Sequence, residues 1–244
     1  MHEEGHDPSH WIAEKASPAD LVSEIDHRAE LKIVELIRHH RPDDAIVAEE
    51  GAAHPGTSGV RWIIDPLDGT RNYLIGYPAH AVSIGVEIDG EPVIGVVHDT
   101  ANDLVYKAMA GAYAEVKNKR LHVKHTSRLD HAIIATGFAP IQAIRSLQGD
   151  ALRRMLPNIG DIRRSGCPSL DLCSVAIGWV HGFFELGLPE WDYAAGRVIV
   201  EAAGGVVRVV KPGKPWPGPV VIAGSEEIVP QLYEELSMAG VPLP

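Results

Sequence analysis

The chain has 244 residues, a formal net charge of −11 and 45% hydrophobic residues, which suits a folded globular protein of one large or two modest domains. Its acidic balance disfavours a nucleic-acid or anionic-membrane surface, because Lys and Arg must displace the counterions of such partners. Two cysteines, Cys167 and Cys173, are too few for a disulfide framework or a four-cysteine zinc site, and no run approaches the roughly 18 apolar residues of a membrane span. We therefore expect a cytoplasmic protein without nucleic-acid or membrane partners.

The first half predicts one helix followed by antiparallel strands. Apolar residues recur at three-to-four spacing from Leu21 to Ile37 and stop before Pro42, which predicts a helix over this stretch. Asp89 and Gly90 separate two apolar runs and predict a hairpin turn. We expect strands at residues 45–48, 61–64, 81–88, 92–97, 104–108 and 112–116.

From about Arg128 the pattern changes to an alternation of strands and helices. No low-complexity linker separates the two parts, so we expect two tightly packed domains, residues 1–127 and 128–244. In the second part we expect strands at 132–135, 183–186, 206–210 and 220–223, and helices at 144–156, 170–180, 191–203 and 228–238.

The segment Asp-Pro-Leu-Asp-Gly-Thr at 65–70 has the clearest chemical pattern. A buried strand ends in two carboxylates, and Pro66 stiffens the turn between them. Gly69 lets the chain bend closely around a small ligand, and Thr70 opens a short helix whose free N–H groups suit a phosphate. Taken alone, the segment is better explained as an Asx turn before a helix.

Further carboxylates change this interpretation. Glu49 and Glu50 end the preceding strand, so neighbouring strands bring several acidic groups to one edge. Such groups cannot share a dry site without large pKa shifts or a cation. Oxygen ligands without a Cys or His pattern select hard ions, so we expect Mg²⁺ as the cofactor. Asp192 opens a later helix, where the helix dipole alone explains a carboxylate but not its pairing with the earlier motif.

Two long motifs carry a family resemblance. Residues 65–70 resemble the first signature of the inositol monophosphatase family, and 191–196 with 201–205 (Trp-Asp-Tyr-Ala-Ala-Gly and Glu-Ala-Ala-Gly-Gly) resemble the second. Residues 15–26 resemble the family's early segment, and the similarity spans about 12–240. It implies a fold of mixed α+β and α/β class, a layered αβαβα sandwich of the sugar-phosphatase type. It also implies Mg²⁺-dependent, lithium-sensitive hydrolysis of phosphate esters by a homodimer.

The resemblance further implies a role for each matching position. The implied metal ligands are four carboxylates and one backbone carbonyl: Glu49, Asp65, Asp68, Asp192 and the carbonyl of Leu67. Thr70 would hold the attacking water, oriented by Asp26, while Glu50 would tune the site from outside. The implied catalytic residues are Thr70, Asp26 and Glu49, and the implied substrate contacts are Gly69, Thr70, Glu185 and Asp192.

The identity of the substrate stays open at this point. Glu185 suits a neutral, hydroxyl-rich leaving group, but it is equally a glutamate at the end of a strand. The first hypothesis is an inositol-1-monophosphatase that releases myo-inositol and phosphate by attack of an activated water. The alternatives are a phosphatase for histidinol phosphate, fructose 1,6-bisphosphate or a nucleotide 3'-phosphate, or a relative that acts mainly as a binding or regulatory protein. Cys167 lacks the Cys-x5-Arg loop of a cysteine phosphatase, so we do not expect it to be a nucleophile.

Overall fold

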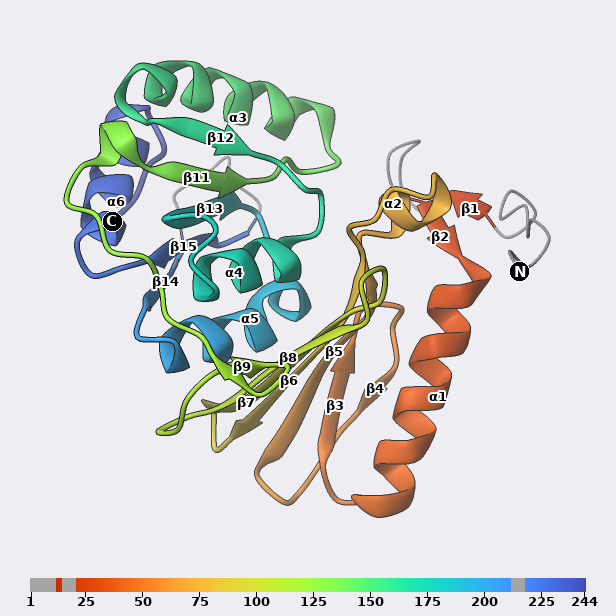
Figure 1. Cartoon of the computed structure of the whole chain (residues 1–244). Helices are drawn as coiled ribbons and strands as arrows, with labels where there is room; N and C mark the ends of the chain where they lie inside the picture. The colour runs from red at the N-terminus through yellow and green to blue at the C-terminus, as the bar shows by residue number, and fades with distance from the viewer. Residues whose placement is uncertain (1–11, 15–20, 212–217) are drawn as a thin grey trace, which may run out of the picture.

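The computed structural model describes residues 12–14, 21–211 and 218–244 (Figure 1). The first half contains one long helix and a series of strands. Its elements are β1 (Ile12–Glu14), β2 (Leu21–Ser23), α1 (Glu24–His40), β3 (Ala45–Ala48), β4 (Ala53–His54), β5 (Val60–Asp68), α2 (Thr70–Leu74), β6 (Ala81–Ile88), β7 (Glu91–Asp99), β8 (Leu104–Met109), β9 (Glu115–Val116) and β10 (Lys119–Arg120).

The second half alternates strands with helices. Its elements are η2 (Leu129–His131), β11 (Ile133–Thr136), α3 (Gln142–Met155), η3 (Leu156–Asn158), β12 (Asp161–Arg163), α4 (Pro168–Ala176), β13 (Gly182–Leu186), α5 (Glu190–Ala202), β14 (Val206–Val210), β15 (Val220–Gly224) and α6 (Ile228–Met238). None of the helices in the described ranges is long and apolar enough to cross a membrane.

The described strands form two main sheets, and helices fill the space between and outside them (Figure 1). The order in the larger sheet is β10-β9-β8-β7-β6-β5-β3-β4, and in the smaller one β12-β11-β13-β15-β14. Helix α1 covers the outer face of the larger sheet, α4 and α5 lie between the sheets, and α3 and α6 cover the smaller sheet. The layers therefore confirm the predicted αβαβα sandwich of mixed class. The boundary between residues 127 and 128 falls after the last strand of the larger sheet and stays a prediction.

Alternation along β5 explains how one strand contacts two helices. Ile64 faces α1 in a small core with Ile37 and Ile46, whereas Ile63 lies beside Tyr193 of α5. Successive side chains of a strand point to opposite faces of the sheet, so a continuous apolar run serves both layers.

Two paired glycines let α5 approach the larger sheet closely. Gly85 of β6 and Gly95 of β7 are cross-strand partners. A Cβ atom at Gly95 would lie 2.2 Å from the carbonyl oxygen of Ala195, and one at Gly85 would lie 2.8 Å from the Cβ of Ala194. No side chain fits at either position, and their absence brings the N-terminal end of α5 down onto the sheet.

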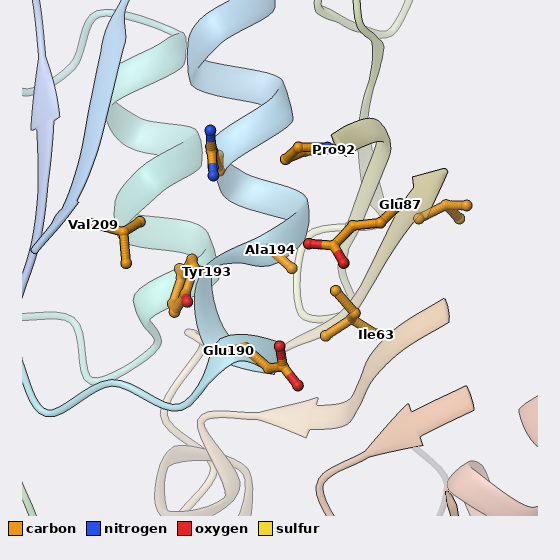
Figure 2. Close-up of a pocket in the computed structure, with 9 residues that line it drawn as sticks. Ile63, Glu87, Pro92, Glu190, Tyr193, Ala194 and Val209 are labelled. Atoms are coloured by element: carbon orange, nitrogen blue, oxygen red, sulfur yellow. The ribbon is translucent and has the colours of Figure 1, made fainter. Parts of the chain in front are cut away.

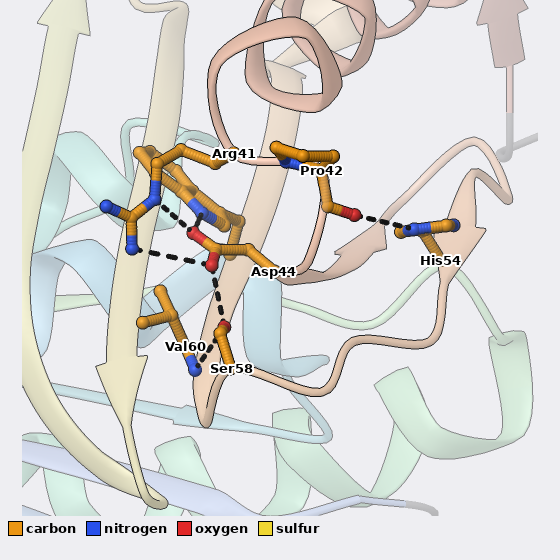
Figure 3. Close-up of polar contacts among 7 residues, drawn as sticks. Arg41, Pro42, Asp44, His54, Ser58 and Val60 are labelled. Atoms are coloured by element: carbon orange, nitrogen blue, oxygen red, sulfur yellow. Dashed lines mark hydrogen bonds and ion pairs between the residues drawn. The ribbon is translucent and has the colours of Figure 1, made fainter.

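Hydrogen bonds of Asp44 link the segment after α1 to the larger sheet (Figure 3). Its carboxylate accepts hydrogen bonds from Arg41 Nε (2.9 Å), Ser58 Oγ (2.6 Å) and Trp62 Nε1 (2.9 Å). Burial by itself raises the pKa of Asp44, but these donors outweigh it and lower the pKa to about 2.

Several predicted boundaries were wrong. The helix expected from Leu21 begins at Glu24, because 21–23 form β2 and pair with β1. Strand β5 continues to Asp68, past the expected end, with a register shift after Asp65 where Pro66 offers no N–H. The strand expected at 112–116 is reduced to β9, and the helix expected at 170–180 is α4, which starts and ends earlier. Strand β12 was not predicted.

We expect Asp44→Asn to destabilise the protein above about pH 4. Because the folded pKa of about 2 lies below the ordinary 3.8, the stabilising contribution is present above 3.8 and is lost as the pH falls toward 2. The variant should therefore have a lower free energy of unfolding at pH 7 and a flatter decline between about pH 4 and 2, measured by urea denaturation. Asp150→Asn, an exposed change on α3, is the control. An unchanged acid slope in Asp44→Asn would contradict this assignment.

Candidate functional site

The ends of two parallel strands place the first two carboxylates side by side. Strands β3 and β5 pair in parallel, with Ala48 opposite Ile64, and the N–H of Glu49 continues the ladder by donating to the carbonyl of Ile64 (3.1 Å). Glu49 and Asp65 therefore follow at the same edge of the sheet. The sequence predicted that these two carboxylates lie at one edge of the sheet, and the structure brings the two residues together.

The turn after Asp65 is held by its own hydrogen bonds. Asp65, which is 1% exposed, accepts the N–H of Leu67 at 3.0 Å, and Thr70 Oγ1 donates to the carbonyl of Leu67 at 3.0 Å. Gly69 has a φ of +83°, and a Cβ there would lie 2.6 Å from the carbonyl of Ala79. Glycine is thus required where the chain turns from β5 into α2.

Asp68 is positioned from the other half of the molecule. Its Oδ2 accepts hydrogen bonds from the N–H (2.7 Å) and the hydroxyl (2.5 Å) of Ser169 and from the thiol of Cys167 (3.0 Å). Burial raises the pKa of Asp68, and these donors counteract the rise. Nothing in the sequence singled out Ser169 as the residue that fixes Asp68.

Asp192 reaches the same centre from the first turn of α5. Burial raises its pKa well above the ordinary value, and the charges of Asp68 and Glu49 raise it further. The pKa of Asp65 is likewise raised well above its ordinary value, first by burial and then by Glu49, Asp68 and Asp192. Carboxylates from β3, β5 and α5 thus repel one another in one buried region.

The donor set fits a hard divalent cation. All the converging groups are carboxylate or carbonyl oxygens, which are the ligands that Mg²⁺ prefers, and their mutual repulsion is the feature that a cation relieves. Within the described ranges, no three His, Cys, Asp or Glu side chains are already arranged so that they could hold a metal ion.

Two acidic residues of α1 lie behind these groups. Asp26 is 2% exposed in the first turn of the helix, which packs against β5. Glu30, one turn later, accepts the N–H groups of Glu50 (2.8 Å) and Ala52 (3.0 Å), so it fixes the turn that carries Glu49. The sequence analysis missed Glu30, although two acids four residues apart on the buried face of a helix were a usable signal.

A cavity of 460 Å³ opens beside the carboxylates and is lined by residues of both halves. Glu49, Gly69 and Thr70 line it from the first half, and Phe138 and Gly166 from the second. Its size lies within the range of about 300–1,000 Å³ that is usual for small-molecule sites. A second cavity, between α5 and strands β5–β7, measures only 70 Å³ and is too small for such a ligand (Figure 2).

Glu185 lies near this region but does not line the larger cavity. It is 7% exposed on β13, and its carboxylate is so close to Gly137 that a Cβ there would lie 2.2 Å from Oε2. Its pKa is raised to about 8, first by burial and then by the charges of Asp171 and Asp68. Its Oε2 has no hydrogen-bond partner among the described residues.

The thiol of Cys167 is unsuited to nucleophilic attack. It is buried against Asp68, and both burial and that carboxylate raise its pKa well above the ordinary value. A thiol of this kind stays protonated, whereas the thiolate is the reactive form.

Comparison with known proteins gives consistent matches over most of the chain. A family model described as "Inositol monophosphatase family" matches residues 2–239. "Nus factor SuhB" of Pasteurella multocida is 40% identical over 194 residues, which cover 78% of this chain and 72% of the relative. "Fructose-1,6-bisphosphatase/inositol-1-monophosphatase" of Aquifex aeolicus is 38% identical over 217 residues, or 88% of this chain and 81% of the relative. The crystal structure of extragenic suppressor protein suhB from Bartonella henselae superposes with a TM-score of 0.84 at 36% identity, covering 92% of this chain and 89% of that one.

We expect Mg²⁺ to stabilise the folded protein, because an ion that binds the folded state relieves the repulsion among the carboxylates. A hundredfold excess over Kd corresponds to about 2.7 kcal/mol. The measurement is the unfolding midpoint in millimolar MgCl₂, in chelator, and in NaCl of equal ionic strength. Asp192→Asn should reduce the response to Mg²⁺. A midpoint that MgCl₂ and chelator leave unchanged would contradict the cation site.

Proposed function

The chain belongs to the inositol monophosphatase family of phosphatases, and we propose that it is a Mg²⁺-dependent enzyme that hydrolyses the phosphate monoesters of small polyols, with inositol 1-phosphate as the reference substrate. The observation that carries the proposal is the convergence of four carboxylates next to a 460 Å³ cavity lined by Gly69 and Thr70. We further propose that the enzyme is a lithium-sensitive cytoplasmic homodimer.

The carboxylates would hold the cofactor. Glu49, Asp65, Asp68 and Asp192 would bind Mg²⁺ through side-chain oxygens, and Leu67 through its carbonyl. Bound Mg²⁺ would lower the pKa of a water molecule and neutralise charge on the phosphate and on the leaving oxygen. Because Ser169 and Cys167 occupy Oδ2 of Asp68, the other oxygen of this carboxylate would serve as the ligand.

The turn after β5 would bind the phosphate and position the water. Gly69 and Thr70 lie at the start of α2 and line the cavity, so that backbone N–H groups at this turn would suit phosphate oxygens. Thr70 Oγ1 donates its proton to the carbonyl of Leu67, so its lone pairs stay available to accept a hydrogen bond from water. Asp26, buried in α1, would orient that water, and in-line placement accounts for much of the rate of phosphoryl transfer.

Glu185 and Asp192 would contact the hydroxyl groups of the leaving polyol. The support for Glu185 is its buried Oε2, which lacks a partner among the described residues, because buried polar atoms are nearly always hydrogen-bonded. A substrate hydroxyl would supply the missing bond.

Other members of the family define the alternatives. A relative named for both fructose-1,6-bisphosphatase and inositol-1-monophosphatase supports a sugar bisphosphate as a second candidate substrate. A relative named as a Nus factor supports a binding or regulatory role beside or instead of catalysis. Phosphate release from inositol 1-phosphate, histidinol phosphate, fructose 1,6-bisphosphate and a nucleotide 3'-phosphate, each with Mg²⁺ and with chelator, tests these candidates together.

Asp65→Asn and Thr70→Ala should fail in different ways. The first removes charge from the cation site, so Mg²⁺ affinity and activity should fall together. The second removes the hydroxyl that would position water, so kcat should fall while Mg²⁺ affinity is largely kept. Calorimetric Mg²⁺ titration beside steady-state kinetics measures both effects, with Thr57→Ala, an exposed change, as the control. Equal losses of Mg²⁺ affinity in both variants would refute this division of roles.

Glu185→Gln should change specificity more than turnover. Loss of one polar contact with the polyol costs on the order of 1–3 kcal/mol, or roughly ten- to a hundredfold in kcat/KM for inositol 1-phosphate. p-Nitrophenyl phosphate has no hydroxyl there and should be hydrolysed with little change. The ratio of the two kcat/KM values is the readout, and Glu91→Gln, at an exposed position, is the control. An unaltered ratio in Glu185→Gln would remove Glu185 from the substrate contacts.

A further inference from the structure

One face of strand β5 meets the first turns of α5 at more than one residue. Arg61 lies four residues before Asp65 on this strand, so the two side chains point to the same face of the sheet. Ile63, which lies between them, is beside Tyr193 of α5, so this is the face that α5 covers. The strand that carries a carboxylate of the proposed cation site therefore also carries an arginine on the side of α5.

Arg61 joins two carboxylates that come from different layers of the fold. Its Nη1 donates to Oε2 of Glu87, the cross-strand partner of Arg61 on β6, at 2.9 Å. Its Nη2 donates to Oε1 of Glu190, the first residue of α5. Figure 2 shows the carboxyl groups of Glu87 and Glu190 extending toward one another between the sheet and the helix. One guanidinium group thus connects the sheet to the start of α5.

The first turn of α5 has a second, weaker polar link to the sheet. The N-cap residue of the helix, Pro189, makes no side-chain hydrogen bond that would fix this turn. Ser83 Oγ of β6 donates to the carbonyl of Trp191 at 3.3 Å. Hydrogen bonds between charged groups are stronger than neutral ones, so the bond between Arg61 and Glu190 is the stronger of these two links.

Asp192 lies in the same turn, two residues after Glu190. Its carboxylate is within electrostatic range of Asp68 and of Asp65. Without a cation, repulsion between these like charges favours movement of the first turn of α5 away from β5. Arg61 opposes this movement, because it attracts Glu190 toward the strand that carries Asp65.

We propose that Arg61 is a positioning residue of the cation site. By binding Glu87 and Glu190 at once, Arg61 holds the first turn of α5 against the sheet. This turn carries Asp192, which thereby stays beside Asp65. The inference rests on the proposed Mg²⁺-dependent phosphatase function and adds to it a residue that acts through Asp192. Arg61 does not line the 460 Å³ cavity, so it acts on the affinity for the ion and not through a contact with the substrate.

The direction of the change in Mg²⁺ affinity separates positioning from a simple effect of charge. Arg61 is a cation, so removal of its charge would by itself strengthen binding of Mg²⁺ nearby. Arg61→Gln also leaves Glu87 and Glu190 facing each other without a cation between them, which favours separation of α5 from the sheet. If Arg61 positions Asp192, this variant should bind Mg²⁺ about three- to tenfold more weakly.

Calorimetric titration with MgCl₂ measures this Kd in the unmodified protein and in matched variants. Glu190→Gln should also weaken binding, and Arg61→Gln/Glu190→Gln should bind no more weakly than Arg61→Gln, because both changes remove the same contact. Arg61→Lys should recover part of the affinity, since an ammonium group can still bind one carboxylate. Arg197→Gln is the control: it removes the same charge from α5, but the partner of Arg197 is Glu201 of the same helix, so Kd should not rise.

Thermal melting in chelator and kinetics at several Mg²⁺ concentrations separate positioning from a loss of structure. Excess Mg²⁺ should restore the kcat of Arg61→Gln, whereas a general loss of structure would lower kcat at every Mg²⁺ concentration and contradict the proposal. If Arg61→Gln does not fold, Glu190→Gln decides, because it leaves no pair of like charges facing each other. An unchanged or lower Kd in the folded variant refutes the positioning role.

Phosphate release from inositol 1-phosphate by the unmodified protein separates this proposal from the proposed function. If no ester is hydrolysed but the Kd for Mg²⁺ depends on Arg61 as expected, the positioning role is supported and the proposed function is refuted. If the ester is hydrolysed with Mg²⁺ while Arg61→Gln keeps or lowers the Kd, the positioning role is refuted and the proposed function stands. If the unmodified protein does not bind Mg²⁺, both are refuted.

Discussion

Repulsion among buried carboxylates is the constraint on which the rest of the site depends. Glu49, Asp65, Asp68 and Asp192 approach one another beside the cavity, and burial raises the pKa of the three aspartates instead of stabilising the fold. Like charges in a low-dielectric region stay together only if other interactions hold them there. Some of these interactions are hydrogen bonds: Ser169 donates to Asp68 through its N–H and its hydroxyl, and Asp65 accepts the backbone N–H of Leu67. A bound divalent cation would supply the rest.

The support comes from both halves of the molecule. Gly85 and Gly95 allow α5, and with it Asp192, to lie directly on the sheet that carries Asp65. Asn72 of α2 donates to the carbonyls of Ala79 (2.7 Å) and Ser165 (3.0 Å), so it joins the turn after β5 to the segment that positions Asp68. Neither half of the chain holds all four carboxylates. The site therefore requires close packing of α5 against the larger sheet, in addition to what this packing contributes to stability.

The sequence predicted those features that are local or that follow from strand pairing. Helix α6 was predicted to the residue because its apolar repeat is uninterrupted, and Glu49 was placed beside Asp65 because both follow buried strands. The predicted start of α1 was wrong because residues 21–23 fit the apolar repeat of the helix but form a short strand that pairs with β1. The apolar repeat of a sequence carries no information about such a pairing partner. Ser169 was missed because a serine at the start of a helix is ordinary until Asp68 is found against it.

The grouping of arginines around the cavity could not be predicted for a related reason. Exposed cations follow no periodicity, so positions 71, 145 and 164 become a group only when α2, α3 and the segment before α4 are seen around one cavity. The cavity wall thus carries both signs of charge, with Glu49 from the carboxylate cluster and Arg71, Arg145 and Arg164 from three other segments. Without a divalent cation, the clustered carboxylates would repel the phosphate group of a substrate. A cation that neutralised them would remove this repulsion, and the arginines would then favour entry of an anion. The cation that would support the chemistry would therefore also be a condition for the phosphate to bind.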